Sequence, residues 1–228
     1  MANFSVAIDG PAGAGKSTLA KAAAKELGFV YVDTGAIYRT VGLAARRAGI
    51  ARDDESGVNA LLPELSVDII YIDGVQHMLL GGEDVTDQIR TPEMSDYASN
   101  VSAMPAVRAY LMDMQRQMAE KYNVIMDGRD IGTVVLPYAS LKVFLTAAVE
   151  KRAARRHLEL REKGIDTSFE EVLAEMRIRD ERDSNRAAAP LKAAEDAVIL
   201  DTGDMTLEES IQALLALIRA ERWEGATV

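Results

Sequence analysis

The sequence predicts an α/β fold of three layers, α/β/α, built on a five-stranded parallel sheet with a small antiparallel β insert and a helical lid. Short apolar runs of strand-forming residues alternate with helical patterns, as expected for right-handed β-α-β crossovers. Two further runs flank Asp73–Gly74, a strong hairpin signal. We expect a single domain over residues 1–228. Its core takes up about residues 1–34, 123–148 and 190–228, its insert region about 35–122, and its lid about 149–189.

The first four elements alternate between strand and helix. They are expected to be a strand at 4–8, a helix at 15–28, a strand at 29–33 and a helix at 36–48. The first run, FSVAI, is apolar almost throughout and stops at Gly10–Pro11, which predicts a strand buried on both faces. Gly28 and Gly49 suit the positions that close the two helices.

The middle of the chain interrupts this alternation. Residues 67–89 contain the hairpin and, after Gly81–Gly82, a segment that one interpretation makes a third strand. Thr91 and Pro92 suit an N-cap and a first helical residue, so a helix is expected to begin there. Met104–Pro105 ends that helix, and a longer, Met-rich helix follows.

The parallel pattern then resumes. Strands are expected at 123–127, 141–147 and 197–202. Two highly charged helices occupy residues 149–185 and are separated by residues 164–168. The last helix begins at Thr206, where Glu209 completes a capping box.

The composition is that of a globular protein, with 48% hydrophobic and 27% charged residues. The net charge of −10 argues against nucleic acid or an anionic membrane as a partner, because such binding needs a basic surface. The absence of Cys excludes disulfides and thiolate zinc sites, and two His argue against a histidine metal site. No apolar run approaches the ~20 residues of a membrane helix, and no secretory signal is recognised, so we expect a cytoplasmic protein.

The stretch GPAGAGKST lies between the first strand and the first helix, and its first eight residues fit the P-loop pattern G-x-x-x-x-G-K-[ST]. Its glycines let successive backbone N–H groups point inward, and the helix N-terminus adds partial positive charge. Lys16 is expected to reach the β- and γ-phosphates of ATP, and the Ser17 hydroxyl to ligate Mg²⁺. The residues expected to bind ATP are Gly10, Pro11, Ala12, Gly13, Ala14, Gly15, Lys16, Ser17 and Thr18.

The rest of the sequence separates the classes of P-loop protein. The chain lacks the Asn-Lys-x-Asp motif of GTPases. One buried strand ends in Asp127, but Gly-Arg-Asp follows it in place of the second acid of a Walker B strand. The length of the chain and its arginine-rich region favour a small-molecule kinase.

Arginines in three separate segments could together clamp an acceptor phosphate. Arg39 lies on the helix after the second strand, Arg129 follows the C-terminal end of a strand, and Arg186 lies in the charged region. Sites in parallel sheets open at these strand ends, and guanidinium groups bind phosphate in a bidentate manner. Each arginine taken alone could instead be a surface ion-pair partner.

Three motifs together resemble those of bacterial cytidylate kinases, which are nucleoside monophosphate kinases. The motifs are DTGAIYR (33–39), DGRDIGTVV (127–135) and RDERDSNRAAAPL (179–191). The resemblance extends from Ile8 to about Asp201 and includes the place of the hairpin insert. It implies a monomer that uses Mg²⁺ and transfers the γ-phosphoryl group of ATP to CMP or dCMP. The catalytic residues that it implies are Lys16, Arg129, Arg179 and Arg186.

Cytosine presents a donor at N4 beside acceptors at N3 and O2, so a carboxylate facing N4 and an arginine facing N3 and O2 would prefer it to uracil. The resemblance assigns these parts to Asp130 and Arg108, with Ser99 and Thr34 nearby; many relatives have serine in place of Thr34. Asp130 could instead only hold Arg129 or cap a helix, and Ser99 could be a surface serine. The residues that the resemblance places around CMP are Thr34, Arg39, Ser99, Arg108, Arg129, Asp130, Arg179, Asp183 and Arg186.

Arg179, Asp183 and Arg186 are spaced to share one helix face, and the resemblance places them at the pentose and the phosphates. A solvated face with many ion pairs is the alternative for this whole charged region. We accept that alternative for Arg177 and Arg182.

The expected mechanism is direct in-line transfer without a covalent enzyme intermediate. A catalytic base is hardly needed, because the acceptor phosphate oxygen is already ionised near neutral pH. The charged helices would exclude water, with Gly164 as a flex point. The resemblance also relates Arg152 and Arg156 to lid arginines that touch ATP. A kinase of the same fold that acts on UMP, AMP or shikimate is one alternative. A nucleotide-binding switch protein without an acceptor site is another.

Overall fold

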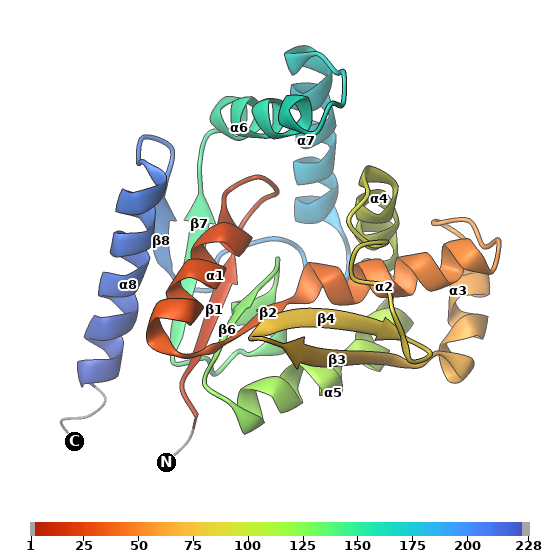
Figure 1. Ribbon diagram of the computed structural model, residues 1–228, viewed down its shortest axis with the longest axis horizontal. Helices are drawn as coiled ribbons and strands as arrows, with labels where there is room; N and C mark the ends of the chain where they lie inside the picture. The colour runs from red at the N-terminus through yellow and green to blue at the C-terminus, as the bar shows by residue number, and fades with distance from the viewer. Residues whose placement is uncertain (1–2, 225–228) are drawn as a thin grey trace.

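The computed structural model describes residues 3–224, and its main sheet has five parallel strands in the order β2-β6-β1-β7-β8 (Figure 1). The strands are β1 (Ser5–Asp9), β2 (Val30–Asp33), β6 (Val124–Asp127), β7 (Leu141–Thr146) and β8 (Val198–Asp201). All neighbouring strands of this sheet pair in parallel. The five strands expected from the sequence are confirmed, each within one residue at either end.

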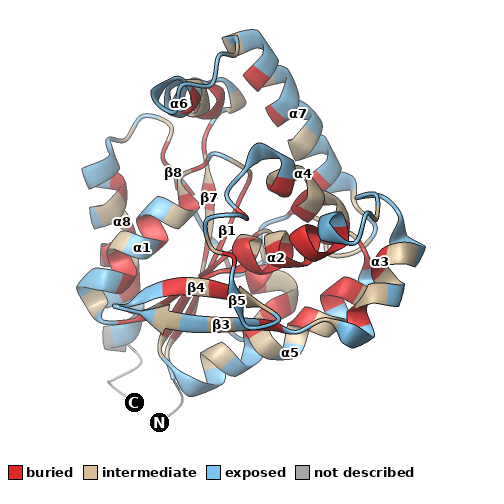
Figure 2. Ribbon diagram, turned by 45° about the vertical axis from the view of Figure 1, so that its right-hand side comes forward, coloured by how far each residue is buried: buried red, intermediate tan, exposed pale blue. Residues whose placement is uncertain are grey.

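The side chains of the strands alternate between two cores, one on each face of the sheet. Figure 2 shows buried residues on the sheet and on the helices around it. Val124 and Met126 of β6 belong to one core and Ile125 to the other, and all three are fully buried. Helices therefore cover both faces, as the continuously apolar strands predict. The helices on the Ile125 side are α1 (Lys16–Leu27) and α8 (Leu207–Glu224), and those on the other side are α2 (Thr34–Arg47), α4 (Pro92–Val101) and α5 (Pro105–Lys121).

Local capping sets where α2 begins. The Asp33 carboxylate accepts a hydrogen bond of 2.8 Å from the backbone N–H of Ala36, so the helix starts at Thr34, two residues before its expected start. Three further turns have no counterpart in the sequence-based prediction, because segments this short carry no periodic pattern. They are α3 (Glu55–Leu61), the 3₁₀ turn η1 (Leu62–Glu64) and the π-helical turn η2 (Ile131–Val135).

The expected insert is a separate antiparallel sheet of β3 (Val67–Ile72), β4 (Val75–Leu80) and β5 (Glu83–Asp84). Its hairpin turns at Asp73–Gly74, where both residues adopt positive φ, +52° and +77°. The third strand, which the sequence left as one interpretation, is confirmed but contains only two residues.

Gln76 of β4 joins the insert to β2, the strand at one edge of the main sheet. Its Oε1 accepts from the backbone N–H of Asp33 at 2.7 Å, and its Nε2 donates to the carbonyl oxygen of Asp33 at 3.2 Å. Tyr71 of β3 adds a hydrogen bond of 2.9 Å from its hydroxyl to the carbonyl oxygen of Tyr31. Because β2 is an edge strand, these side chains satisfy backbone groups that a neighbouring strand would otherwise pair.

The two charged helices, α6 (Val149–Glu162) and α7 (Phe169–Asn185), stand beyond the C-terminal ends of the strands (Figure 1). They pack on each other through a small core of Ala153, Leu160, Val172 and Met176. This pair is the expected lid. Among residues 3–224, the structure contains no helix that is both long enough and apolar enough to cross a membrane.

Replacing Gln76 with Leu tests how the insert is held. The Asp33 N–H would lose its partner while remaining buried, so the free energy of unfolding should fall by about 1–3 kcal/mol in urea denaturation. Gln88→Leu is the control, because Gln88 is exposed and bonds only exposed side chains in the same region. Equal losses in the two variants would contradict this account.

Candidate active site

The phosphate loop connects β1 to α1, and its first residue must be glycine. Gly10 has φ +146°, and a Cβ there would lie 2.0 Å from the carbonyl oxygen of Leu145 in β7. Gly13 and Gly15 also adopt positive φ, +72° and +90°. The neighbouring strand therefore excludes any side chain at the start of the loop.

Lys16 folds back over this loop. Its Nζ donates to the carbonyl oxygens of Gly10 at 2.7 Å and Pro11 at 2.8 Å, and its side chain is buried. Burial, together with the nearby positive charge of Arg129, lowers the pKa of Lys16 well below its usual value. An anion such as a polyphosphate would compensate this buried amine better than neutral carbonyls do.

Asp127 ends β6 beside the first turn of α1. Its Oδ2 accepts from the Ser17 hydroxyl and its Oδ1 from the Tyr31 hydroxyl, both at 2.8 Å. The Thr34 hydroxyl donates to the Asp127 carbonyl oxygen at 2.7 Å. Burial and then the negative charge of Asp33 raise the pKa of Asp127.

Ser17 and Asp127 could hold Mg²⁺ jointly with substrate oxygens and water, which is the usual way this ion is bound beside phosphates. The part of the chain from 3 to 224 contains no group of three or more His, Cys, Asp or Glu side chains that could hold a metal. The sequence-based assignment named Ser17 alone. The sequence did carry a signal for Asp127, since it is an acidic residue at the end of a buried strand in a chain that has a P-loop.

Asp130 lies between two buried arginines. One carboxylate oxygen accepts from Arg108, and the other accepts from Arg186 Nη2 at 3.2 Å. All three side chains are at most 7% exposed. Arg129 instead donates from Nε to Asp183 Oδ2 at 2.9 Å. Asp130 thus has an ion-pair role with arginines other than Arg129, and its side chain does not cap the turn η2 that follows.

Two guanidinium groups have unsatisfied buried donors. The Nε atoms of Arg39 and Arg179 find no hydrogen-bond partner among residues 3–224. Burial lowers the pKa of Arg179 to about 10, and the positive charges of Arg129, Arg39 and Arg156 act in the same direction. Unsatisfied donors inside a cluster of positive charge are the arrangement expected of an anion-binding site.

Ser99 of α4 is buried, so it is not a surface serine. Arg182 of the lid reaches it, since its Nη1 lies 3.3 Å from both Ser99 Oγ and Asp96 Oδ1. Arg182 therefore makes the expected surface ion pair but also contacts a predicted base-site residue. Arg177 bonds the exposed carboxylate of Glu150, as expected of a solvated ion pair.

The two predicted lid arginines differ in their surroundings. Arg152 donates from Nη1 to the carbonyl oxygen of Ala12 in the phosphate loop at 2.9 Å, and from Nη2 to Asp180 Oδ2 at 2.6 Å. Arg156 forms a partly exposed ion pair with Glu159. Arg152 thus links α6 and α7 directly to the loop.

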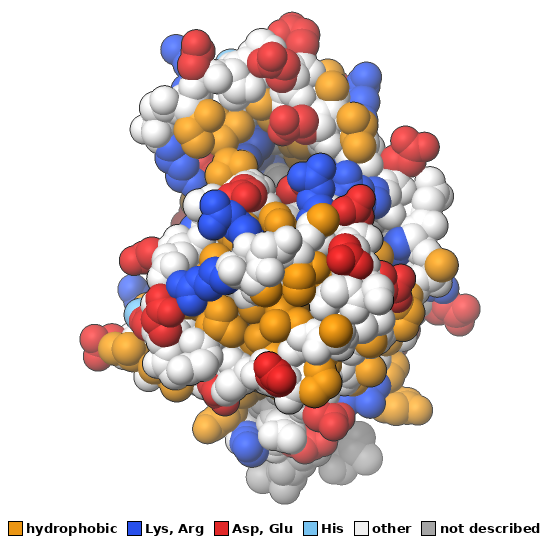
Figure 3. All heavy atoms as spheres, turned by 90° about the vertical axis from the view of Figure 1, so that its right-hand side faces the viewer, with side chains coloured by type: hydrophobic (Ala, Val, Ile, Leu, Met, Phe, Trp, Pro, Cys, Tyr) orange, Lys and Arg blue, Asp and Glu red, His pale blue; other side chains and the backbone are white. Residues whose placement is uncertain are grey.

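The phosphate loop, Asp127 and the arginines converge at the C-terminal ends of β1, β2 and β6, beneath the lid. Figure 3 shows Lys and Arg side chains gathered where the lid meets the rest of the molecule. Such an arrangement can hold two phosphate groups near each other and exclude water between them.

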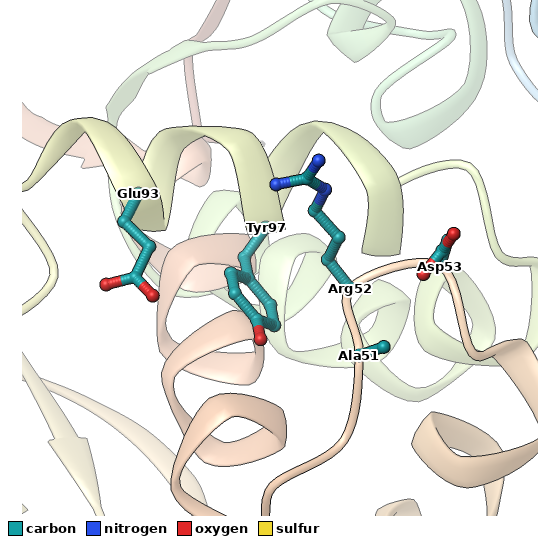
Figure 4. Close-up of a pocket in the computed structure, with 5 residues that line it drawn as sticks. All are labelled: Ala51, Arg52, Asp53, Glu93 and Tyr97. Carbon is teal, nitrogen blue, oxygen red and sulfur yellow. The ribbon is translucent and has the colours of Figure 1, made fainter.

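A separate hollow of about 300 Å³ lies between α4 and the segment before α3 (Figure 4). Its lining residues are Ala51, Arg52, Asp53, Glu93 and Tyr97. Arg52 and Glu93 are exposed and already form ion pairs with Asp96 and Arg46. The buried, incompletely paired charges lie at the sheet end and not in this hollow.

Comparison with known proteins gives one family. The family model described as cytidylate kinase matches residues 6–220. A curated cytidylate kinase of Carboxydothermus hydrogenoformans is 50% identical over 213 residues, 93% of this chain and 96% of the relative. Another, of Syntrophotalea carbinolica, is 48% identical over 217 residues, 95% of this chain and 92% of the relative. An uncharacterized protein from Eubacterium ventriosum, with a TM-score of 0.50, 13% identity and coverage of 96% and 99%, is similar in fold alone.

Asp130→Asn tests the electrostatics of the site. The variant leaves two buried guanidinium groups without their shared counter-charge, so the free energy of unfolding should fall by about 3 kcal/mol in urea denaturation. The control is Asp96→Asn, which removes a carboxylate that also faces two arginines but is 36% exposed. It should change the stability by less than about 1 kcal/mol. A stability loss no larger in Asp130→Asn than in the control would contradict the analysis.

Proposed function

The chain belongs to the cytidylate kinase family, and we propose that it uses this site to transfer the γ-phosphoryl group of ATP to CMP or dCMP, giving ADP and CDP or dCDP. One observation carries the proposal. The P-loop lysine, the Ser17–Asp127 pair and a buried cluster of arginines around Asp130 lie together at one end of the sheet. A phosphate donor and a phosphate-bearing pyrimidine acceptor therefore have adjoining sites.

ATP lies with its β- and γ-phosphates in the phosphate loop. The backbone N–H groups at the start of α1 face these phosphates, and Lys16 moves from the carbonyl oxygens of Gly10 and Pro11 to the phosphate oxygens. Ser17 and Asp127 would hold Mg²⁺. When bound, Mg²⁺ neutralises charge on the β- and γ-oxygens.

The acceptor phosphate lies among Arg39, Arg129 and Arg179, two of which have buried Nε donors that no residue of 3–224 satisfies. Arg186 completes this cluster. These guanidinium groups offset the charge of both phosphates and hold the attacking oxygen in line with the γ-phosphorus. No general base is required, because the phosphate oxygen of CMP is already ionised near neutral pH.

The base is selected by Asp130 and Arg108. The Asp130 carboxylate accepts from the cytosine N4 amino group, and Arg108 donates to N3 and O2. Uracil would place its O4 acceptor against the same carboxylate and its N3–H against the arginine. Ser99 and Thr34 border the base, and Asp183 lies at the pentose beside Arg129. Arg186 orients Asp130 through its contact with the second carboxylate oxygen.

The lid of α6 and α7 closes over the two phosphates and keeps water from the γ-phosphoryl group. Arg152 and Arg156 of α6 contact ATP; the bond of Arg152 to the Ala12 carbonyl oxygen of the phosphate loop supports its part in this. That the protein is a monomer and acts in the cytoplasm remains a prediction from the sequence.

A coupled assay of ADP release tests the proposal, with Mg-ATP and CMP, dCMP, UMP, AMP or no acceptor. Rapid turnover is expected with CMP and dCMP. The kcat/KM for UMP should be lower by at least ~10-fold, since one reversed donor–acceptor pair costs about 1–3 kcal/mol. Equal rates with UMP or AMP would contradict the roles of Asp130 and Arg108. ATP turnover that no monophosphate changes would contradict the acceptor site.

Asp127→Asn tests the metal site. The loss of one anionic ligand should weaken Mg²⁺-dependent binding of ADP by ~10-fold or more, a typical effect for groups that support a metal. Calorimetric titration of ADP at several Mg²⁺ concentrations measures this without turnover. Asp201→Asn is the control, because Asp201 ends the parallel strand β8 but is exposed. An unchanged Mg²⁺ dependence in Asp127→Asn would place the ion elsewhere.

A further inference from the structure

Asp9 is the last residue of β1, directly before Gly10, and the mechanism above gives it no part. Its side chain is 4% exposed. One carboxylate oxygen accepts from the backbone N–H of Ile131 and the other from that of Gly132, both at 2.7 Å. A single carboxylate thus holds two successive N–H groups of a segment more than 120 residues away in the chain.

The segment that Asp9 holds carries the acceptor-binding side chains. Arg129 and Asp130 directly precede Ile131. The backbone position of residues 131 and 132 therefore also fixes the positions of Arg129 and Asp130. On its other side, Asp9 is covalently joined to the phosphate loop. We propose that Asp9 is a positioning residue that fixes the acceptor-binding segment relative to the phosphate loop and so keeps the two phosphates in line. This inference rests on the proposed kinase function.

The chemistry of the contact requires a carboxylate. Bonds from backbone N–H groups to an ionised carboxylate are short and strong, and both oxygens can accept at once. Asparagine offers one acceptor and would set its NH₂ against the second N–H. There is also little free space, because a Cβ at Gly132 would lie 3.2 Å from the Lys142 side chain and 3.4 Å from Asp9 Oδ2.

The charge of Asp9 is not favoured by its surroundings. Burial, and more weakly the negative charge of Asp130, raise the pKa of Asp9 to about 6, while the two N–H groups act in the opposite direction. Folding therefore gains little from the charge itself, because the two N–H bonds are offset by the cost of burying a carboxylate. Groups with pKa values raised in this way cluster at functional sites.

Asp9→Asn is the test, because it keeps the shape and removes one acceptor. The residues that bind ATP and CMP remain, so both KM values should stay within ~3-fold, whereas kcat should fall by ~10- to 100-fold, as expected for a misalignment of up to about 1 Å. The melting temperature should not fall by more than a few degrees, because the variant also removes a buried charge. The control is Asp54→Asn, an exposed carboxylate that also accepts from a backbone N–H, that of Gly57 at 2.9 Å. Its kcat should match that of the wild type.

Either of two results with Asp9→Asn would overturn the inference. One is an unchanged kcat in Asp9→Asn. The other is a loss of activity that follows a large fall in melting temperature, which would make Asp9 only structural.

Asp9→Ala, which removes both acceptors, provides a second measurement by calorimetry, where ATP and CMP should each bind within a few-fold of the wild-type affinity. Loss of CMP affinity alone would make Asp9 part of the acceptor site and contradict positioning. A wild-type protein without CMP-dependent turnover would contradict the proposed function itself, whatever the Asp9 variants do.

Discussion

The parallel pairing of β1 with β6 is the constraint on which the site depends. It sets Ile8 opposite Asp127, so the phosphate loop leaves one strand where the acceptor-binding segment leaves the next. The pairing continues beyond the strands, since Gly128 N–H donates to the Ile8 carbonyl oxygen and two further N–H groups donate to Asp9. The proposed donor and acceptor sites therefore lie on neighbouring strand ends, where sites in open parallel sheets are found.

The second constraint is electrostatic. The chain has a net charge of −10, yet its buried positive charges gather at one end of the sheet. Asp130 forms ion pairs with two of the arginines and Asp183 with a third, so two carboxylates face three guanidinium groups. Lys16 bonds neutral carbonyl oxygens, and Arg179 has a buried donor that no described residue satisfies. Two phosphate-bearing substrates would supply the missing negative charge, which explains how an acidic protein can bind polyanions tightly and locally.

Much of the fold could be predicted from the sequence, because contiguous patterns encode it. The five strands, the hairpin, the lid and the phosphate loop each follow from periodicity, turn residues or a short motif. The site was predictable only in part. Ser17 could be assigned from its motif, and its partner Asp127 had a signal in its position at the end of a buried strand. The bonds of Gln76 to Asp33, the contact of Arg182 with α4 and the bonds of Asp9 instead join residues 43 to 123 positions apart. Such contacts depend on how the elements pack and leave no local trace in the sequence.

The central claim is that one buried arginine–carboxylate cluster binds the acceptor beside the phosphate loop. A crystal structure with CMP, Mg²⁺ and a non-hydrolysable ATP analogue tests it most directly. The account predicts the cytosine N4 within hydrogen-bond distance of Asp130 and the CMP phosphate in contact with Arg39, Arg129 and Arg179. It also predicts the analogue's γ-phosphate in line with the nearest CMP phosphate oxygen. CMP bound away from Asp130, or with its phosphate outside the arginine cluster, would contradict the account.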